Sequence, residues 1–208
     1  MNREQLAKKA ENIARAAKGL DTDLPMATQK ACQEYGSIRA EMLVQVQPPV
    51  GGYGGCVSIE SQGSLECVQD ESTGVLVFCS AKRPGGGWLT GATAQEESIS
   101  RASTWALSCE HPVFHSDTGN DGYFYKNAVL SVAGKILERN NTPLAIPAPV
   151  HFVGMCAPNA RAMQEHGLQP ESNTVRKKII DALVIRMRLA LQSFALVKCN
   201  TVILGAVG

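Results

Sequence analysis

The chain has 208 residues, of which 44% are hydrophobic, and this size and composition predict one globular domain with a buried core. Its formal net charge of +1 and its scattered lysines and arginines disfavour general binding to nucleic acid. No apolar run approaches the roughly 20 residues that span a bilayer, and the charged amino-terminal segment does not read as a signal peptide. We therefore expect a cytoplasmic protein without a membrane partner, with a nuclear location open for a eukaryotic or viral source.

The seven cysteines predict free thiols in a reducing compartment, because their number is odd and none forms the CxxC spacing of zinc or redox sites. The nearest approach to a metal site is Cys109 with His111 and His115, which a helix would bring to one face. Pro112 lies between the histidines, and a proline there is more typical of a solvated loop. The sequence therefore predicts no metal site and no cofactor.

The first predicted elements are helices. Residues 3–18 carry apolar side chains at helical spacing among charges, and Gly19 follows where a helix would end. A short helix is predicted at residues 26–34, and the prolines and glycines of residues 48–55 predict a turn or loop. We expect a single domain over residues 1–208, in which residues 1–70 form a helical N-terminal extension.

A short apolar run at residues 75–79 is typical of a strand buried on both faces of a largely parallel sheet. Three consecutive glycines, Gly85, Gly86 and Gly87, follow it as a loop, and residues 95–108 can form a helix. This order places the loop at the carboxyl end of a strand, where α/β proteins usually bind ligands.

The rest of the chain predicts further strands and one long helix. Strands are predicted at residues 123–132 and 151–155, with the proline-rich residues 142–149 as their connection. A helix over residues 173–197 precedes a last strand at residues 201–204. The predicted buried face of this helix comprises Ile179, Ile180, Leu183, Val184, Met187, Leu191 and Phe194. The last strand ends in a second glycine-containing turn formed by Gly205, Ala206, Val207 and Gly208.

The glycine loop suits an anion, because backbone N–H groups can approach a ligand there without side chains in the way. A diphosphate is the expected ligand of such a loop, although a run of glycines is equally typical of a flexible turn. Seven residues separate Gly87 from Gln95, Glu96 and Glu97, which stand at the start of the predicted helix. Two adjacent carboxylates are therefore expected near the anion site.

The two glutamates admit different explanations. Thr93 and Glu96 have the spacing of a capping box, and acidic residues are favoured in the first turn of a helix. Glu97 points about 100° further round the helix. A cap does not need it, so it is free for proton transfer.

The string PGGGWLTGATAQEESISRAS at residues 84–103 resembles the signature of the macrodomain-type poly(ADP-ribose) glycohydrolases of the microbial branch, in which GGG precedes QEE by a few residues. CAPN at residues 156–159 and LGA at residues 204–206 resemble shorter motifs of the same family. The resemblance covers roughly residue 75 to the end of the chain. It implies an α/β fold, a macrodomain-like three-layer α/β/α sandwich with a mixed sheet.

The resemblance also implies a function. The chain would cleave the ribose–ribose O-glycosidic bond of poly(ADP-ribose) or remove ADP-ribose from modified targets, without a metal. Glu97 would be the general acid and then the base, and Glu96 would hold a sugar hydroxyl. The other residues expected at the substrate are Gln95, which would support the loop, then Gly85, Gly86 and Gly87, and, as part of a second phosphate loop, Gly205, Ala206, Val207 and Gly208.

Two departures from the family pattern leave alternatives open. Lys82, Arg83 and Pro84 stand where the family usually has an asparagine, and Arg83 could meet a phosphate or change the accepted linkage. Family members also continue past the last strand with the rest of the second loop and a C-terminal helix, before which this sequence ends. The shorter sequence would be a natural short form, a truncated product or part of an assembly. The alternative function is a weak or inactive ADP-ribose-binding macrodomain. A third class is a hydrolase acting on ADP-ribosylated bases or small molecules.

Overall fold

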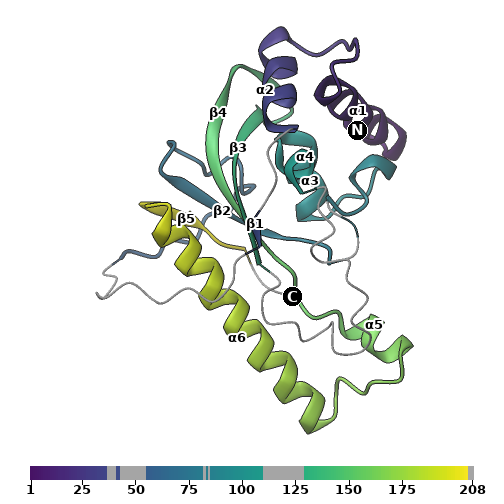
Figure 1. Cartoon of the computed structure of the whole chain (residues 1–208), viewed down its shortest axis with the longest axis vertical. Coiled ribbons are helices and arrows are strands. Elements are labelled where there is room, and N and C mark those ends of the chain that lie inside the picture. Colours follow the sequence, from purple (N-terminus) through teal and green to yellow (C-terminus); the bar gives the residue numbers. More distant parts are fainter. Residues whose placement is uncertain (37–40, 43–54, 82, 84, 110–128, 206–208) are drawn as a thin grey trace.

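The computed structural model describes residues 1–36, 41–42, 55–81, 83, 85–109 and 129–205, and it contains a five-stranded mixed sheet (Figure 1). The strand order is β1-β3-β4-β2-β5. The strands are β1 (Glu41–Met42), β2 (Thr73–Phe78), β3 (Val129–Arg139), β4 (Thr142–Met155) and β5 (Thr201–Ile203). β1, β3 and β4 are antiparallel neighbours, whereas β2 runs parallel to both β4 and β5. The predicted mixed sheet is confirmed.

Helices cover both faces of this sheet (Figure 1). They are α1 (Arg3–Ala17), α2 (Met26–Gly36), α3 (Gln95–Ala102), α4 (Trp105–Ser108), α5 (Ala160–Glu165) and α6 (Asn173–Leu196), with a 3-10 turn, η1 (Trp88–Thr90). The two predicted N-terminal helices are therefore confirmed, and a capping box between Asn2 and Gln5 begins α1. Among the helices described here, none is long and apolar enough to cross a bilayer.

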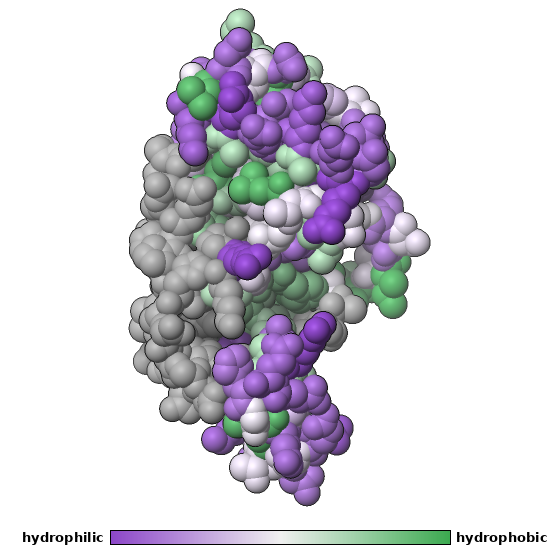
Figure 2. All heavy atoms as spheres, turned by 90° about the vertical axis from the view of Figure 1, so that its right-hand side faces the viewer, coloured by the Kyte–Doolittle hydropathy of each residue, from purple (hydrophilic) through white to green (hydrophobic). Residues whose placement is uncertain are grey.

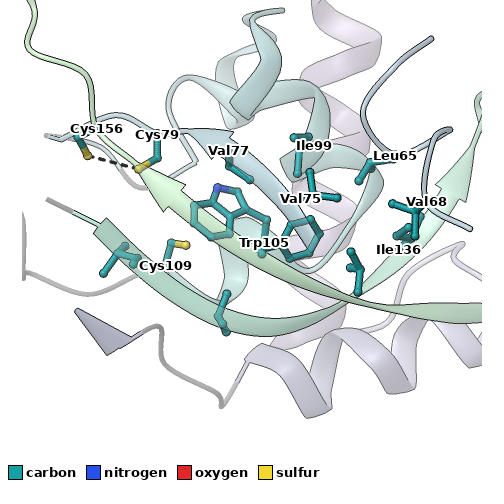
Figure 3. Packing of buried hydrophobic residues seen from close by; sticks show 14 residues of the cluster. Leu65, Val68, Val75, Val77, Cys79, Ile99, Trp105, Cys109, Ile136 and Cys156 are labelled. Carbon is teal, nitrogen blue, oxygen red and sulfur yellow. Dashed lines mark hydrogen bonds between the residues drawn. The ribbon is translucent and has the colours of Figure 1, made fainter. Parts of the chain in front are cut away.

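β2 is buried because strands flank it and helices cover its two faces. Val75 and Val77 pack with Ile99 of α3 and Trp105 of α4 (Figure 3). Leu76 points the other way and joins the cluster that α6 covers. This alternation confirms the predicted buried strand and the three-layer arrangement.

The predicted single helix over residues 95–108 is wrong, because it breaks between α3 and α4. Ser103 forms an isolated bridge with Ile136 of β3. Thr104 N–H donates to the Lys135 carbonyl at 3.0 Å, and Lys135 N–H donates to Thr104 Oγ1 at 2.9 Å. Two residues therefore leave the helix to bond the sheet, which anchors the helical layer on β3.

The predicted connection at residues 142–149 is also wrong, since these residues belong to β4. The hairpin turns at Asn140 and Asn141, whose φ values of 50° and 60° suit a two-residue turn of the primed type. β2 pairs with β4 only from His151 to Met155, so the prolines lie where β3 is the strand neighbour, and prolines are tolerated at such an edge. Of the strand predicted at residues 123–132, residues 129–132 lie in β3 and the others lie outside the described part.

α6 forms as predicted, but only part of its predicted apolar face is buried, including Phe194. Ile180, Val184 and Leu191 are 51%, 43% and 44% exposed. The buried positions are Ala182, Arg186, Leu189, Ala190, Ser193 and Phe194. The inner face thus carries Leu189 and Phe194 beside small and polar side chains, and Ile180, Val184 and Leu191 face outward.

Candidate active site

The side chain of Gln95 completes the hydrogen bonding of β2 near its carboxyl end. β5 pairs with β2 only as far as Val75. Beyond that point, Gln95 Oε1 accepts from Phe78 N–H at 2.8 Å, and Gln95 Nε2 donates to the Leu76 carbonyl at 2.9 Å. The amide takes the place of a neighbouring strand, so it fixes the start of α3 against the strand that leads into the glycine loop.

The glycine loop wraps around the two glutamates. Gly85 and Gly86 have φ values of 75° and 61°, which favour glycine. A Cβ atom on Gly86 would overlap Glu97 Oε1 and lie 2.9 Å from Glu97 Cδ. The loop therefore needs glycine at this position for two reasons, backbone conformation and the space taken by a carboxylate.

All three glycine N–H groups already have acceptors within the protein. Gly85 N–H donates to Glu96 Oε1 at 2.9 Å and Gly87 N–H to Glu97 Oε1 at 2.9 Å. Gly86 N–H donates to the Arg83 carbonyl at 2.7 Å. The expectation that these N–H groups are available to a diphosphate is therefore corrected. The missing side chains let the loop lie directly against Trp88, Ala92 and Glu97.

Glu96 holds the loop with both of its carboxylate oxygens. Besides the bond from Gly85, its Oε2 accepts from Ser80 N–H at 2.7 Å. Burial is the main cause that raises the pKa of Glu96 to about 7, and the adjacent Glu97 carboxylate adds to it, whereas the bonds from Ser80 and Gly85 oppose it. The capping-box explanation is wrong, because the N-cap of α3 is Ala94 and no side chain caps it.

Glu97 is buried but only half bonded. Glu97 is 9% exposed, and its Oε1 accepts a hydrogen bond from Gly87 N–H. Oε2 is buried and has no hydrogen-bond partner among the residues that the structure describes. A buried polar atom without a partner costs about 1–3 kcal/mol, so a role outside the fold explains its retention.

Arg101 is a residue of the site that the sequence reasoning missed. It lies one helical turn after Glu97, is 3% exposed, and donates to the carbonyls of Trp88 and Ala92 at 3.1 and 2.6 Å. Burial lowers the pKa of Arg101, and the Glu97 carboxylate opposes this effect. The i, i+4 spacing of an acidic and a basic residue was the available signal.

Two thiols meet at the carboxyl ends of β2 and β4. Cys79 and Cys156 lie with their Sγ atoms 3.3 Å apart, above the ring of Trp105 (Figure 3). Their hydrogen bond and burial raise the pKa of the Cys79 thiol well above its ordinary value, and burial does the same for Cys109. The Cys79 and Cys109 thiols are therefore neutral packing groups at pH 7.

The predicted metal-site candidate has no support within the described residues. Cys109 lies in the apolar core, and His111 and His115 lie outside the described part. No group of three or more His, Cys, Asp or Glu side chains in that part could hold a metal ion.

The second predicted loop begins beside the end of β2. A Cβ atom on Gly205 would lie 2.7 Å from the ring of Phe78, the last residue of β2. Ala206, Val207 and Gly208 lie outside the described residues, as do Lys82 and Pro84. Figure 2 views the side on the right of Figure 1, where hydrophilic side chains above and below border a recess with apolar atoms set back in it.

Residues 52–132 match the family model for the catalytic domain of microbial-type PARG, that is, poly(ADP-ribose) glycohydrolase. The matched segment contains β2, the glycine loop and both glutamates. The predicted resemblance to this family is confirmed for residues 52–132. No curated protein matches the chain.

Solved structures of PARG share this fold. The PARG of Thermomonospora curvata superimposes with a TM-score of 0.72 at 20% identity, covering 98% of this chain and 80% of that one. The PARG of Deinococcus radiodurans in complex with ADP-ribose gives a TM-score of 0.56 at 20% identity, covering 99% of this chain and 71% of that one. At this identity the structural likeness establishes the macrodomain-like fold, and the family match adds the hydrolase class.

Proposed function

We propose that this chain hydrolyses ADP-ribose polymers as a PARG-type glycohydrolase, with Glu97 as its proton donor. The observation that carries the proposal is the buried, unpartnered Glu97 Oε2 beneath a glycine loop at the carboxyl end of a parallel strand. The family match to the same segment and the PARG fold support this class of enzyme.

The chemistry needs one proton donor that later becomes a base. Cleavage of the ribose–ribose bond leaves the electron pair on the departing oxygen, which takes a proton from Glu97 Oε2. The remaining ribose has oxocarbenium character, which the adjacent diphosphate of the substrate stabilises. The Glu97 carboxylate then takes a proton from water as its oxygen bonds to the anomeric carbon. One water is consumed and the acid is restored.

The surrounding residues position the substrate. Gly87 N–H holds Oε1, which leaves Oε2 as the atom that faces the glycosidic oxygen. The missing side chain of Gly86 lets the loop lie against the Glu97 carboxylate. We assign the diphosphate to the second loop, which starts at Gly205 beside Phe78 and would continue through Ala206, Val207 and Gly208. The ADP-ribose bound to the Deinococcus radiodurans enzyme supports ADP-ribose as the ligand.

The test compares the wild-type chain with Glu97→Ala on labelled poly(ADP-ribose) and on mono-ADP-ribosylated protein. We expect ADP-ribose release by the wild type and a loss of about 10²–10⁴-fold in the variant, as for removal of a general acid. No release by the wild type from either substrate would overturn the hydrolase. Calorimetry with ADP-ribose then decides the alternative of a binding module, and no heat at millimolar ligand would overturn both functions.

The cytoplasmic location and the single domain over residues 1–208, with its N-terminal extension at residues 1–70, stay predictions from the sequence.

A further inference from the structure

The turn that follows the glycine loop is held by two arginines. Arg101 binds both of its ends, since Nη1 donates to the Trp88 carbonyl at 3.1 Å and Nη2 to the Ala92 carbonyl at 2.6 Å. Arg3 of α1 donates from Nε to the Thr90 carbonyl at 2.8 Å, from the exposed side. One buried and one exposed guanidinium therefore hold the carbonyls of Trp88, Thr90 and Ala92.

This turn is bonded directly to Gly87, which in turn holds the catalytic carboxylate. The Gly87 carbonyl accepts from Thr90 N–H at 3.0 Å, from Ala92 N–H at 3.2 Å and from Thr90 Oγ1 at 3.0 Å. On its other side, Gly87 N–H donates to Glu97 Oε1 at 2.9 Å. A displacement of the turn would therefore rotate Gly87 and change where Oε2 points.

Arg101 is buried, yet it forms no ion pair with any of the described residues. Removing a guanidinium from water is costly, and the two carbonyls, aided by the nearby Glu97 charge, are what the structure offers in return. Arg101 also lies on the same helix as Glu97, four residues on, so α3 carries both the carboxylate and the group that holds the loop against it.

From this geometry we infer that Arg101 is a positioning residue of the proposed reaction. It holds residues 88–92 so that Gly87 N–H stays on Glu97 Oε1 and Oε2 stays directed at the substrate. The inference rests on the proposed function. It differs from a role in stability alone, because the distance it controls is that between the loop and the proton donor.

The experiment compares Arg101→Gln and Arg101→Lys with wild type, and uses Arg3→Gln as the matched control on the same turn. We expect Arg101→Gln to lower kcat on poly(ADP-ribose) at least about tenfold while KM and the affinity for ADP-ribose change less than about threefold. Lysine keeps the charge and one donor direction, so it should recover part of kcat. Arg3→Gln should change kcat less than about threefold, because its bond to the Thr90 carbonyl is exposed and water can replace it.

Hydrogen exchange of the unliganded proteins supplies a readout that does not need turnover. The amides of Gly87, Thr90 and Ala92 should exchange faster in Arg101→Gln than in wild type. Unchanged kcat in a folded Arg101→Gln, or an equal loss of kcat and ADP-ribose affinity, would overturn the inference. If Arg101→Gln does not fold, Arg101→Lys carries the same comparison. If the wild type is inactive, the proposed function fails, and unchanged exchange at these amides would overturn the clamp by itself.

Discussion

Two polar regions lie inside this fold, one on each side of the sheet, and they differ in how completely their polar atoms are hydrogen-bonded. On the α6 side, Arg186 donates to the Cys156 carbonyl at 2.5 Å, and Ser193 donates to Ser131 at 3.0 Å. Ser131 in turn lies 2.7 Å from His151 Nε2. On the α3 side, Glu96 and Arg101 are likewise bonded to backbone, but Glu97 Oε2 is left without a partner.

The difference teaches how to separate structural from functional polar groups. Both regions bury charged side chains, so burial does not distinguish them. In the α6 region, Ser193 bonds β3, Arg186 bonds the residue that follows β4, and Ser131 and His151 join two strands, so these bonds stabilise packing. In the α3 region the bonds direct one carboxylate so that a single oxygen remains for a ligand. The first region should therefore respond to mutation in stability, and the second in activity.

Gly86→Ala should give the largest effect, because the new Cβ atom meets Glu97. The matched control is Gly167→Ala, which has a similar φ of 78° and no atom within 4 Å of the new Cβ. Left-handed backbone strain alone costs about 1–2 kcal/mol and affects both variants. We expect Gly86→Ala to lose, in addition, at least about tenfold in hydrolysis, since the carboxylate must move. Equal activity of the two variants in a release assay, with stability measured by urea unfolding, would contradict this.

Arg186→Met should act on stability. It leaves the Cys156 carbonyl buried without this donor, and we expect the free energy of unfolding to fall by about 2–3 kcal/mol, with kcat of the folded protein nearly unchanged. Arg188→Met is the control, because that side chain lies on the exposed face of α6, two residues on, and should change stability by less than about 0.5 kcal/mol. A loss of kcat without a loss of stability would place Arg186 in the functional region instead.

The smallest effect concerns pH and His151. Burial lowers the pKa of His151 from its ordinary value of 6.5, so the unfolded chain binds the proton more tightly than the folded one. Its contribution to the free energy of unfolding is therefore present above pH 6.5 and is lost as the pH falls below that value. Glu96 titrates in the opposite sense, because its pKa is raised to about 7. The measurement is thus the difference between wild type and His151→Asn across pH 5 to 8, and parallel curves would contradict the prediction.

Much of the α3 region could be predicted from the sequence because its signals are local. A short apolar run predicts β2, three glycines predict a loop, and two adjacent glutamates at the next helix predict carboxylates beside it. What could not be predicted was which acceptors the glycine N–H groups bond. The same three glycines are compatible with N–H groups that bond a phosphate and with N–H groups that bond the protein's own carboxylates.

The α6 region was harder to predict because its contacts are distant in sequence. The apolar periodicity predicts that Ile180, Val184 and Leu191 face inward. Arg186 and Ser193 face inward instead, because they bond acceptors in β3 and directly after β4. The hairpin at Asn140 and Asn141 was missed for another reason: three prolines nearby gave a stronger turn signal than two asparagines.

The amide of Gln95 has a consequence for how this protein behaves in a crowded solution. The stretch of β2 beyond Val75 has no β5 residue paired to it, and an unpaired strand edge is a template for pairing with a second chain. Gln95 occupies the Phe78 donor and the Leu76 acceptor along that stretch. We therefore expect Gln95 to hinder pairing of a second chain with β2 as well.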